Sequence, residues 1–123
     1  MKTVTQATSH LSYENLSYET RSLLAEIKAA VQGCLPSAGV LLYGSTDRGQ
    51  NGPESDYDLM ILTDTALAVS EQEVIRDCLY PIELRQSIVI SSLFYTKSEW
   101  QASEHWATPF LREVAHDAIL VNT

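Results

Sequence analysis

Two short apolar runs, joined by a loop rich in glycine, serine and carboxylates, constrain this chain more than any other stretch. The first run, residues 40–43, leads into Gly44 and Ser45, and after ten further residues a second run begins with Asp56 and Asp58. A continuous apolar run is typical of a strand that is covered on both faces. Residues i and i+2 of a strand face the same side, with Cα atoms about 7 Å apart. The two carboxylates are therefore predicted to project side by side, next to a loop that exposes backbone N–H groups.

Helical patterns lie on either side of these two runs. Before them, apolar residues recur at helical spacing from about Ser17, and Pro36 marks the end of the pattern. After them, Ser70 and Glu73 have the spacing of a capping box and predict the start of a second helix. Pro81 is expected to kink or end that helix near the preceding residue.

The remaining pattern completes an α+β fold. Residues 88–95 are β-branched and aromatic and predict a third strand, Ser98 opens a short helix, and residues 119–121 fit a final strand. Because a loop and not a helix joins the first two strands, we expect them to pair antiparallel. The sequence thus predicts a small mixed β-sheet backed by helices on one face. Residues 1–123 are expected to form a single domain, with residues 1–16 as a loosely ordered lead-in.

The charge balance argues against a nucleic-acid-binding protein. Sixteen acidic residues against eight Lys and Arg give a net charge of −8, and no basic cluster is present. Neutralisation of phosphates supplies much of the affinity for DNA or RNA, so we do not expect a nucleic-acid partner. A basic protein surface, or a nucleotide delivered with its metal, fits this acidity better.

The cysteines and the N-terminus bear on the compartment. Cys34 and Cys78 are far apart in the sequence and each falls on an apolar helical stripe, so we expect buried free thiols. The N-terminal residues lack the apolar core of a signal peptide, and no run approaches the length of a membrane span. These features predict a cytoplasmic protein without a membrane partner.

The loop and the two carboxylates together suit the binding of nucleotide phosphates and a divalent metal. Asp56 and Asp58 can hold the metal, because Mg²⁺ prefers a few carboxylates and keeps its other ligands for water and phosphate oxygens. Gly44 permits close approach of the backbone to a phosphate, Ser45 can donate its hydroxyl, and Arg48 can add a charged fork. The alternative is structural: residues 44–55 merely connect two strands, and the aspartates lie at the exposed entrance of the second.

The same residues resemble a known superfamily. Gly44-Ser45, Arg48 and Ser55-Asp56-Tyr57-Asp58-Leu59 are similar to the signature of the nucleotidyltransferases that include DNA polymerase beta. Within that superfamily, the chain resembles the small stand-alone minimal nucleotidyltransferase (MNT-type) proteins. The resemblance implies transfer of a nucleoside monophosphate, from an NTP that is expected to be ATP, onto a hydroxyl of a partner molecule. It also implies Mg²⁺ or Mn²⁺ at Asp56 and Asp58.

The resemblance further suggests a protein partner. Small relatives of this type are often paired with an all-helical HEPN protein in toxin–antitoxin modules, in which the nucleotidyltransferase is the antitoxin. The aromatic residues Trp100, Trp106 and Phe110 either cover the end of the sheet or form a surface for a partner. Homo-oligomer and heteromer both stay open.

The sequence departs from the family at one point. Active members usually carry a third carboxylate near the start of the next core strand, whereas residues 87–95 contain no acid. Ser91 is the candidate for that position, and Glu83 is the nearest acid upstream. Either Glu83 substitutes as a catalytic residue, or the site holds two carboxylates. The second case favours an alternative function, a catalytically degenerate nucleotide-binding or regulatory subunit with the same fold. A plain interaction domain without a nucleotide is a third interpretation.

Overall fold

The structure is a computed structural model that describes residues 16–45, 55–106 and 118–121. Within these ranges the elements follow one another as α2 (Tyr18–Cys34), β1 (Gly39–Ser45), β2 (Ser55–Thr63), α3 (Val69–Gln86), β3 (Ile88–Thr96), α4 (Lys97–Trp106) and β4 (Ile119–Leu120). The expected lead-in, residues 1–16, lies outside the described residues except for Leu16, which packs against the apolar core between the helices and the sheet. No helix in the described ranges has the length and apolar character needed to cross a membrane.

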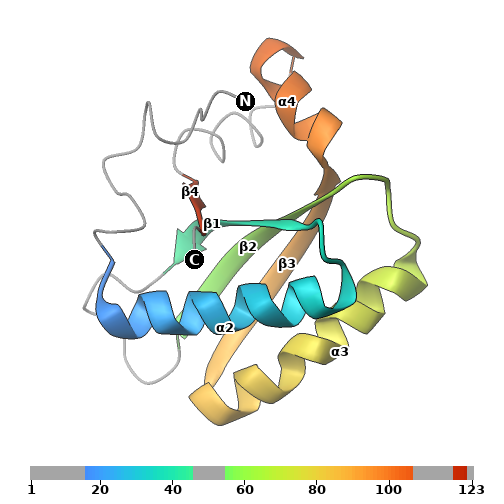
Figure 1. The fold of residues 1–123 in the computed structure, drawn as a ribbon. Coiled ribbons are helices and arrows are strands. Elements are labelled where there is room, and N and C mark those ends of the chain that lie inside the picture. Colours follow the sequence, from blue (N-terminus) through green and yellow to red (C-terminus); the bar gives the residue numbers. More distant parts are fainter. Residues whose placement is uncertain (1–15, 46–54, 107–117, 122–123) are drawn as a thin grey trace.

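The four strands form one mixed sheet in the order β3-β2-β1-β4 (Figure 1). β1 pairs antiparallel with β2 and with β4, whereas β2 and β3 run parallel. The short connection between β1 and β2 reverses the chain, while α3 provides the crossover that a parallel pair requires. The prediction of an α+β fold with a small mixed sheet and an antiparallel first pair is confirmed.

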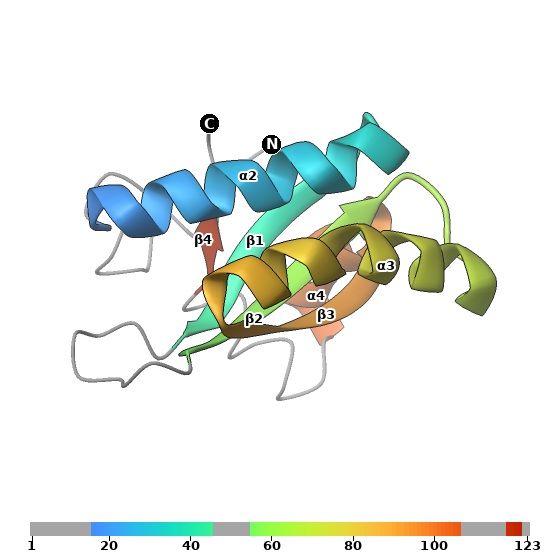
Figure 2. The same cartoon turned by 90° about the horizontal axis from the view of Figure 1, so that it is seen from below.

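Helices α2 and α3 cover one face of the sheet (Figure 2). Their apolar stripes meet every second residue of β2, because alternate side chains of a strand point to opposite faces. The side chains buried in this helix-side core are Leu23, Leu24, Ile27, Val31, Ala38, Val40, Leu42, Tyr57, Leu59, Ile61, Ile75, Leu79, Ile82, Ile119 and Val121. The helix-side core is the larger of the two apolar clusters and fixes the position of β2.

A smaller cluster lies on the opposite face of the sheet. Leu41, Met60 and Leu62 pack there with Trp100 and Ala118, and Tyr43 and Tyr95 are half-buried against them. The expectation that helices back one face therefore holds for α2 and α3, whereas α4 contributes Trp100 to the other face. Trp100 is 5% exposed and belongs to this cluster. The side chains of Trp106 and Phe110 lie outside the described residues.

Local signals place the helix starts. The Ser17 hydroxyl accepts a hydrogen bond from the backbone N–H of Thr20 and caps α2, which begins close to the predicted start of the helical pattern near Ser17. In α3 the predicted cap at Ser70 is wrong: the Glu71 carboxylate accepts from the backbone N–H of Ala68, so the helix begins one residue before Ser70. Of the two outcomes expected at Pro81, an end of the helix is excluded, since α3 continues to Gln86.

The start of α4 differs from the prediction in the same way. Thr96 and Glu99 form a reciprocal cap: the Thr96 hydroxyl accepts from the Glu99 N–H, and the Glu99 carboxylate accepts from the Thr96 N–H. Ser98 therefore lies inside the first turn and does not open the helix.

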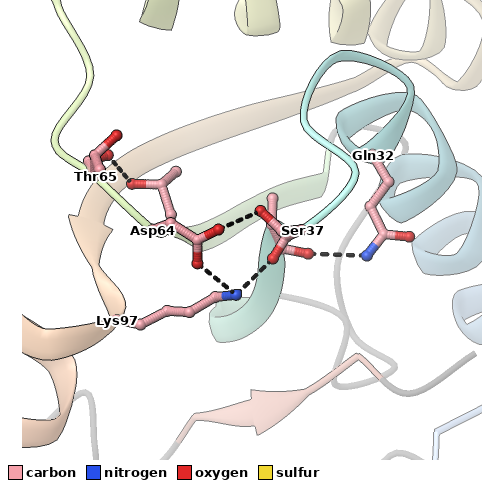
Figure 3. Close-up of polar contacts among 7 residues, drawn as sticks. Gln32, Ser37, Asp64, Thr65 and Lys97 are labelled. Atoms are coloured by element: carbon pink, nitrogen blue, oxygen red, sulfur yellow. Dashed lines mark hydrogen bonds and ion pairs between the residues drawn. The ribbon is translucent and has the colours of Figure 1, made fainter.

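A polar cluster joins three segments at the end of β2 (Figure 3). Asp64, the residue after β2, accepts a 2.7 Å hydrogen bond from the Ser37 hydroxyl and lies 3.1 Å from the Lys97 ammonium. The same ammonium donates to the backbone oxygen of Ser37, and Gln32 donates to the backbone oxygen of Ala38. The cluster ties the turn before β1 to the start of α4, at the end of β2 away from Asp56.

Candidate functional site

Asp56 and Asp58 lie near the start of β2 and point to the same face of the sheet. Tyr57 between them is 6% exposed and belongs to the helix-side core, so the two aspartates face away from α2 and α3. Asp56 is exposed and Asp58 is half-buried. The sequence-based prediction that the two carboxylates project side by side agrees with this arrangement.

Asp58 of β2 has one pairing partner on each of the two neighbouring strands. On β1 its partner is Gly44, and on the parallel strand β3 its partner is Ser91. The β1–β2 register shifts between Leu42 and Gly44, which is the pattern of a β-bulge at Tyr43. One flank of Asp58 is thus a glycine without a side chain, and the other is an exposed serine.

The electrostatics of this face concentrate negative charge. Partial burial, followed by the charge of Asp56, raises the pKa of Asp58. Burial also raises the pKa of Tyr43, with further contributions from the charge of Asp58 and from Tyr95. Because burial and the charge of Asp56 both disfavour the ionised form of Asp58, a bound cation would offset an unfavourable interaction at this position.

The predicted phosphate-binding residues are described only in part. Gly44 and Ser45 end β1, and their backbones pair with Asp58 and Tyr57 respectively. The side chain of Ser45 and the whole of Arg48 lie outside the described residues. The structure therefore brings the Gly-Ser backbone next to the aspartate pair, and the role of Arg48 stays a prediction.

Glu83 lies on α3, the helix that covers the opposite face of the sheet. Its carboxylate oxygen Oε2 accepts a 2.8 Å hydrogen bond from the backbone N–H of Ile90 in β3. Among the described residues, no group of three or more Asp, Glu, His or Cys side chains has the spacing to hold a metal ion. The structure thus brings Asp56 and Asp58 together and does not bring Glu83 to them.

Ser91 occupies the position expected for a third carboxylate. Register partners in a parallel pair lie about 4.8 Å apart and point to the same face, so Ser91 stands beside Asp58. A serine hydroxyl adds no charge to the pair. The two aspartates fit a hard cation such as Mg²⁺, which is held by one or two carboxylates together with substrate phosphates.

Sequence reasoning missed the two tyrosines of this face. Tyr43 and Tyr95 are half-buried against the small cluster. The charge of Asp58 and the Tyr95 side chain both contribute to the raised pKa of Tyr43, which connects the two tyrosines to the site. A signal was available for Tyr43, because it directly precedes the Gly-Ser pair. Tyr95 shares a face with Ser91 through the two-residue period of β3, but only the parallel pairing with β2 brings it near Tyr43.

Comparison with known proteins agrees with this geometry. A family model described as a nucleotidyltransferase domain matches residues 21–115, a span that includes β1, β2, α3 and β3. A search of curated proteins gives no match to the chain. The matched span covers more than half of the sequence and contains both aspartates. The chain therefore belongs to the nucleotidyltransferase domain family, whose general reaction is the transfer of a nucleoside monophosphate.

Proposed function

We propose that this protein is a metal-dependent nucleotidyltransferase that moves a nucleoside monophosphate from ATP to a hydroxyl of a partner molecule. The observation that supports it most is the position of Asp56 and Asp58 on one accessible face of β2, with the Gly44 backbone beside Asp58. Nucleotidyl transfer asks the protein mainly for positioning and electrostatic stabilisation, and these residues are suited to both.

Each residue has a role in this proposal. Asp56 and Asp58 would hold Mg²⁺ or Mn²⁺, which would neutralise phosphate charge and polarise the reacting oxygens. Gly44 would let its backbone approach the triphosphate, and Ser45 and Arg48 would donate to phosphate oxygens. The raised pKa of Asp58 supports the cation, because a positive charge favours the ionised form of both carboxylates.

The acceptor is proposed to be another protein. The net charge of −8 suits a basic protein surface better than a nucleic acid. The resemblance to MNT-type proteins adds the specific proposal that the partner is a HEPN-type toxin and that this chain acts as its antitoxin.

Transfer of label from α-labelled ATP tests the proposal. The purified chain is incubated with Mg²⁺ or Mn²⁺ and a lysate of source cells, beside the Asp56→Asn/Asp58→Asn double variant. We expect a labelled protein with the wild type and none with the variant, and recovery of the labelled species identifies the acceptor. Label of equal intensity with the variant would contradict the assignment of the two aspartates.

A second function is favoured by one observation, the presence of Ser91 beside Asp58. A site with two carboxylates instead of three fits a nucleotide-binding or regulatory subunit that has lost turnover. Saturable, metal-dependent ATP binding without any transfer of label would support this function over the first.

The substitution Ser91→Asp separates the two functions. If the chain is a degenerate member, the new carboxylate beside Asp58 is expected to create transfer activity that the wild type lacks. If the wild type is already active with two carboxylates, the gain should be small. Ser70→Asp is the matched control, because Ser70 is exposed in the first turn of α3, where an acidic side chain is tolerated.

A further inference from the structure

Two thiols from different helices meet on the helix side of the protein. The Sγ atoms of Cys34, the last residue of α2, and Cys78, within α3, lie 2.9 Å apart, although the residues are 44 positions apart in the sequence. Both cysteines are reduced and only partly buried. The expectation of free thiols is confirmed, whereas the expectation that they are buried is wrong, since both are only half-buried. The packing of two helices brings together side chains that the sequence separates.

A second contact aligns the same helices. Arg85 of α3 forms an ion pair with Glu26 of α2, about two helical turns away from the cysteines along each helix. The residue numbers rise along α3 as they fall along α2, so the helices run antiparallel and the two contacts are in register. The thiols thus meet in an arrangement that the surrounding helix packing also holds.

The two sulfur atoms are close enough that a small movement would let a disulfide form. A disulfide has an S–S length of about 2.05 Å, so the sulfur atoms need to approach by less than about 1 Å. The hydrogen bond with Cys78, followed by burial, raises the pKa of Cys34 and favours the thiol in the reduced protein. Neither cysteine belongs to the aspartate site, so their chemistry is separate from nucleotide transfer.

We propose that Cys34 and Cys78 form a reversible redox site, which a peroxide oxidises to a disulfide between α2 and α3. In the first step one sulfur attacks a peroxide oxygen, the O–O bond breaks, and a sulfenic acid and water are formed. In the second step the other sulfur attacks the sulfenic sulfur, the S–O bond breaks, and a second water leaves. Two thiols and one hydrogen peroxide give one disulfide and two waters, and an added dithiol reverses the change.

The disulfide would close a covalent loop of the chain that contains the candidate site. The loop between the two cysteines contains all of β1 and β2, and with them Gly44, Asp56 and Asp58. A crosslink over a loop of this length restricts the unfolded chain strongly and is expected to raise the melting temperature by about 10 °C. The oxidised form should therefore be the more heat-resistant of the two.

Thiol counting and melting of the full chain test the proposal without any nucleotide. The protein is treated with increasing hydrogen peroxide, the remaining thiols are alkylated, and the mass and melting temperature are measured before and after dithiothreitol. We expect both thiols to disappear together, a mass lower by two hydrogens, a linked Cys34–Cys78 peptide and a rise of about 10 °C that dithiothreitol reverses.

The variants Cys34→Ser and Cys78→Ser are matched controls. Each has a single cysteine and should therefore form no crosslink within the monomer and show no rise in melting temperature with peroxide. If a variant does not fold, the wild type compared with and without peroxide still decides. Thiols that stay open to alkylation, crosslinks only between molecules, or a lower melting temperature after crosslinking would overturn the proposal. None of these results bears on nucleotide transfer.

Discussion

The two faces of β2 differ in what their side chains do. On the helix side, Tyr57, Leu59 and Ile61 are buried against α2 and α3. On the other face, Met60 and Leu62 are buried at one end, whereas Asp56 and Asp58 are accessible at the other. The same strand thus anchors the fold with one set of residues and presents the candidate chemistry with the alternate set. A carboxylate pair can be placed accurately in this way, because the packing of its neighbours leaves the strand little freedom.

The largest effect is expected from breaking the helix-side anchor. Leu59 is 0% exposed, so Leu59→Ala should lower the free energy of unfolding by about 2–5 kcal/mol, through lost apolar burial and a residual cavity. Urea denaturation measures the change. The control Asp56→Asn, on the accessible face, should change stability by less than about 0.5 kcal/mol. Equal losses in the two variants would contradict the division of the strand into two faces.

A smaller effect is expected at Glu83, and it separates a structural role from a metal-binding one. Glu83→Ala removes the acceptor for the Ile90 N–H and should lower stability by about 1–3 kcal/mol, while Glu83→Gln keeps an acceptor and should lose less. Stabilisation by Mg²⁺, followed as a shift in melting temperature, should be the same in both variants. Loss of the Mg²⁺ effect with unchanged stability would make Glu83 a ligand.

The substitution Asp58→Asn should slightly stabilise the protein in the absence of a divalent cation, by less than about 1 kcal/mol. The folded protein raises the pKa of Asp58, so the native state binds this proton more tightly than the unfolded state. Stability from this group is therefore present at low pH and is lost as the pH rises from the ordinary carboxylate pKa, about 3.9, through the raised value. Urea unfolding over this pH range should show a weaker loss in the variant.

Added Mg²⁺ should reverse the order of the two proteins. The wild type should be stabilised by the cation, whereas Asp58→Asn should not respond. A variant that responds to Mg²⁺ as the wild type does would count against Asp58 as a ligand.

The smallest effect is expected at Asp64, which contrasts with Asp58 at the opposite end of β2. The hydrogen bond from Ser37, followed by the Lys97 ammonium, lowers the pKa of Asp64. Its contribution is therefore present above the ordinary carboxylate pKa and is lost as the pH falls through the lowered value. In Asp64→Asn the acid-induced loss of stability should be slightly shallower, and added salt should reduce the difference between the proteins. A steeper acid-induced loss of stability in the variant would contradict a lowered pKa of Asp64.

Strand periodicity made part of this site predictable. The alternation of Asp56, Tyr57 and Asp58 predicts two carboxylates on one face, and the short loop predicts the antiparallel pairing with β1. Both follow from local rules that hold whatever surrounds the strand. The position of Ser91 beside Asp58 could not be predicted from local rules, because the register of a parallel pair depends on how α3 packs across the sheet. The bulge at Tyr43 has no clear local signal either.

The helix starts and the thiol pair show the same limit. Ser70 and Glu73 have the capping-box spacing, yet Glu71 caps the Ala68 N–H, because competing local motifs one or two residues apart differ little in free energy. Pro81 does not end α3, since Ile75, Leu79 and Ile82 hold the helix against the sheet on both sides of it. Cys34 and Cys78 come together only through tertiary packing, which no local period reports.

Helix α3 also supplies side chains to the edge of the sheet at β3. Among the strands of the described ranges, β3 pairs with β2 alone. The Glu83 carboxylate accepts a hydrogen bond from the Ile90 N–H of β3, and the Arg76 guanidinium donates to the Ser92 carbonyl oxygen. Arg76 is held in turn by Glu73 and by the ring of Phe94. Two backbone groups of β3, the Ile90 N–H and the Ser92 carbonyl oxygen, are thereby occupied by side chains, which opposes edge-to-edge pairing at this point of the strand. A strand added at this edge would have to displace the contacts of Glu83 and Arg76 before it could pair with this part of β3.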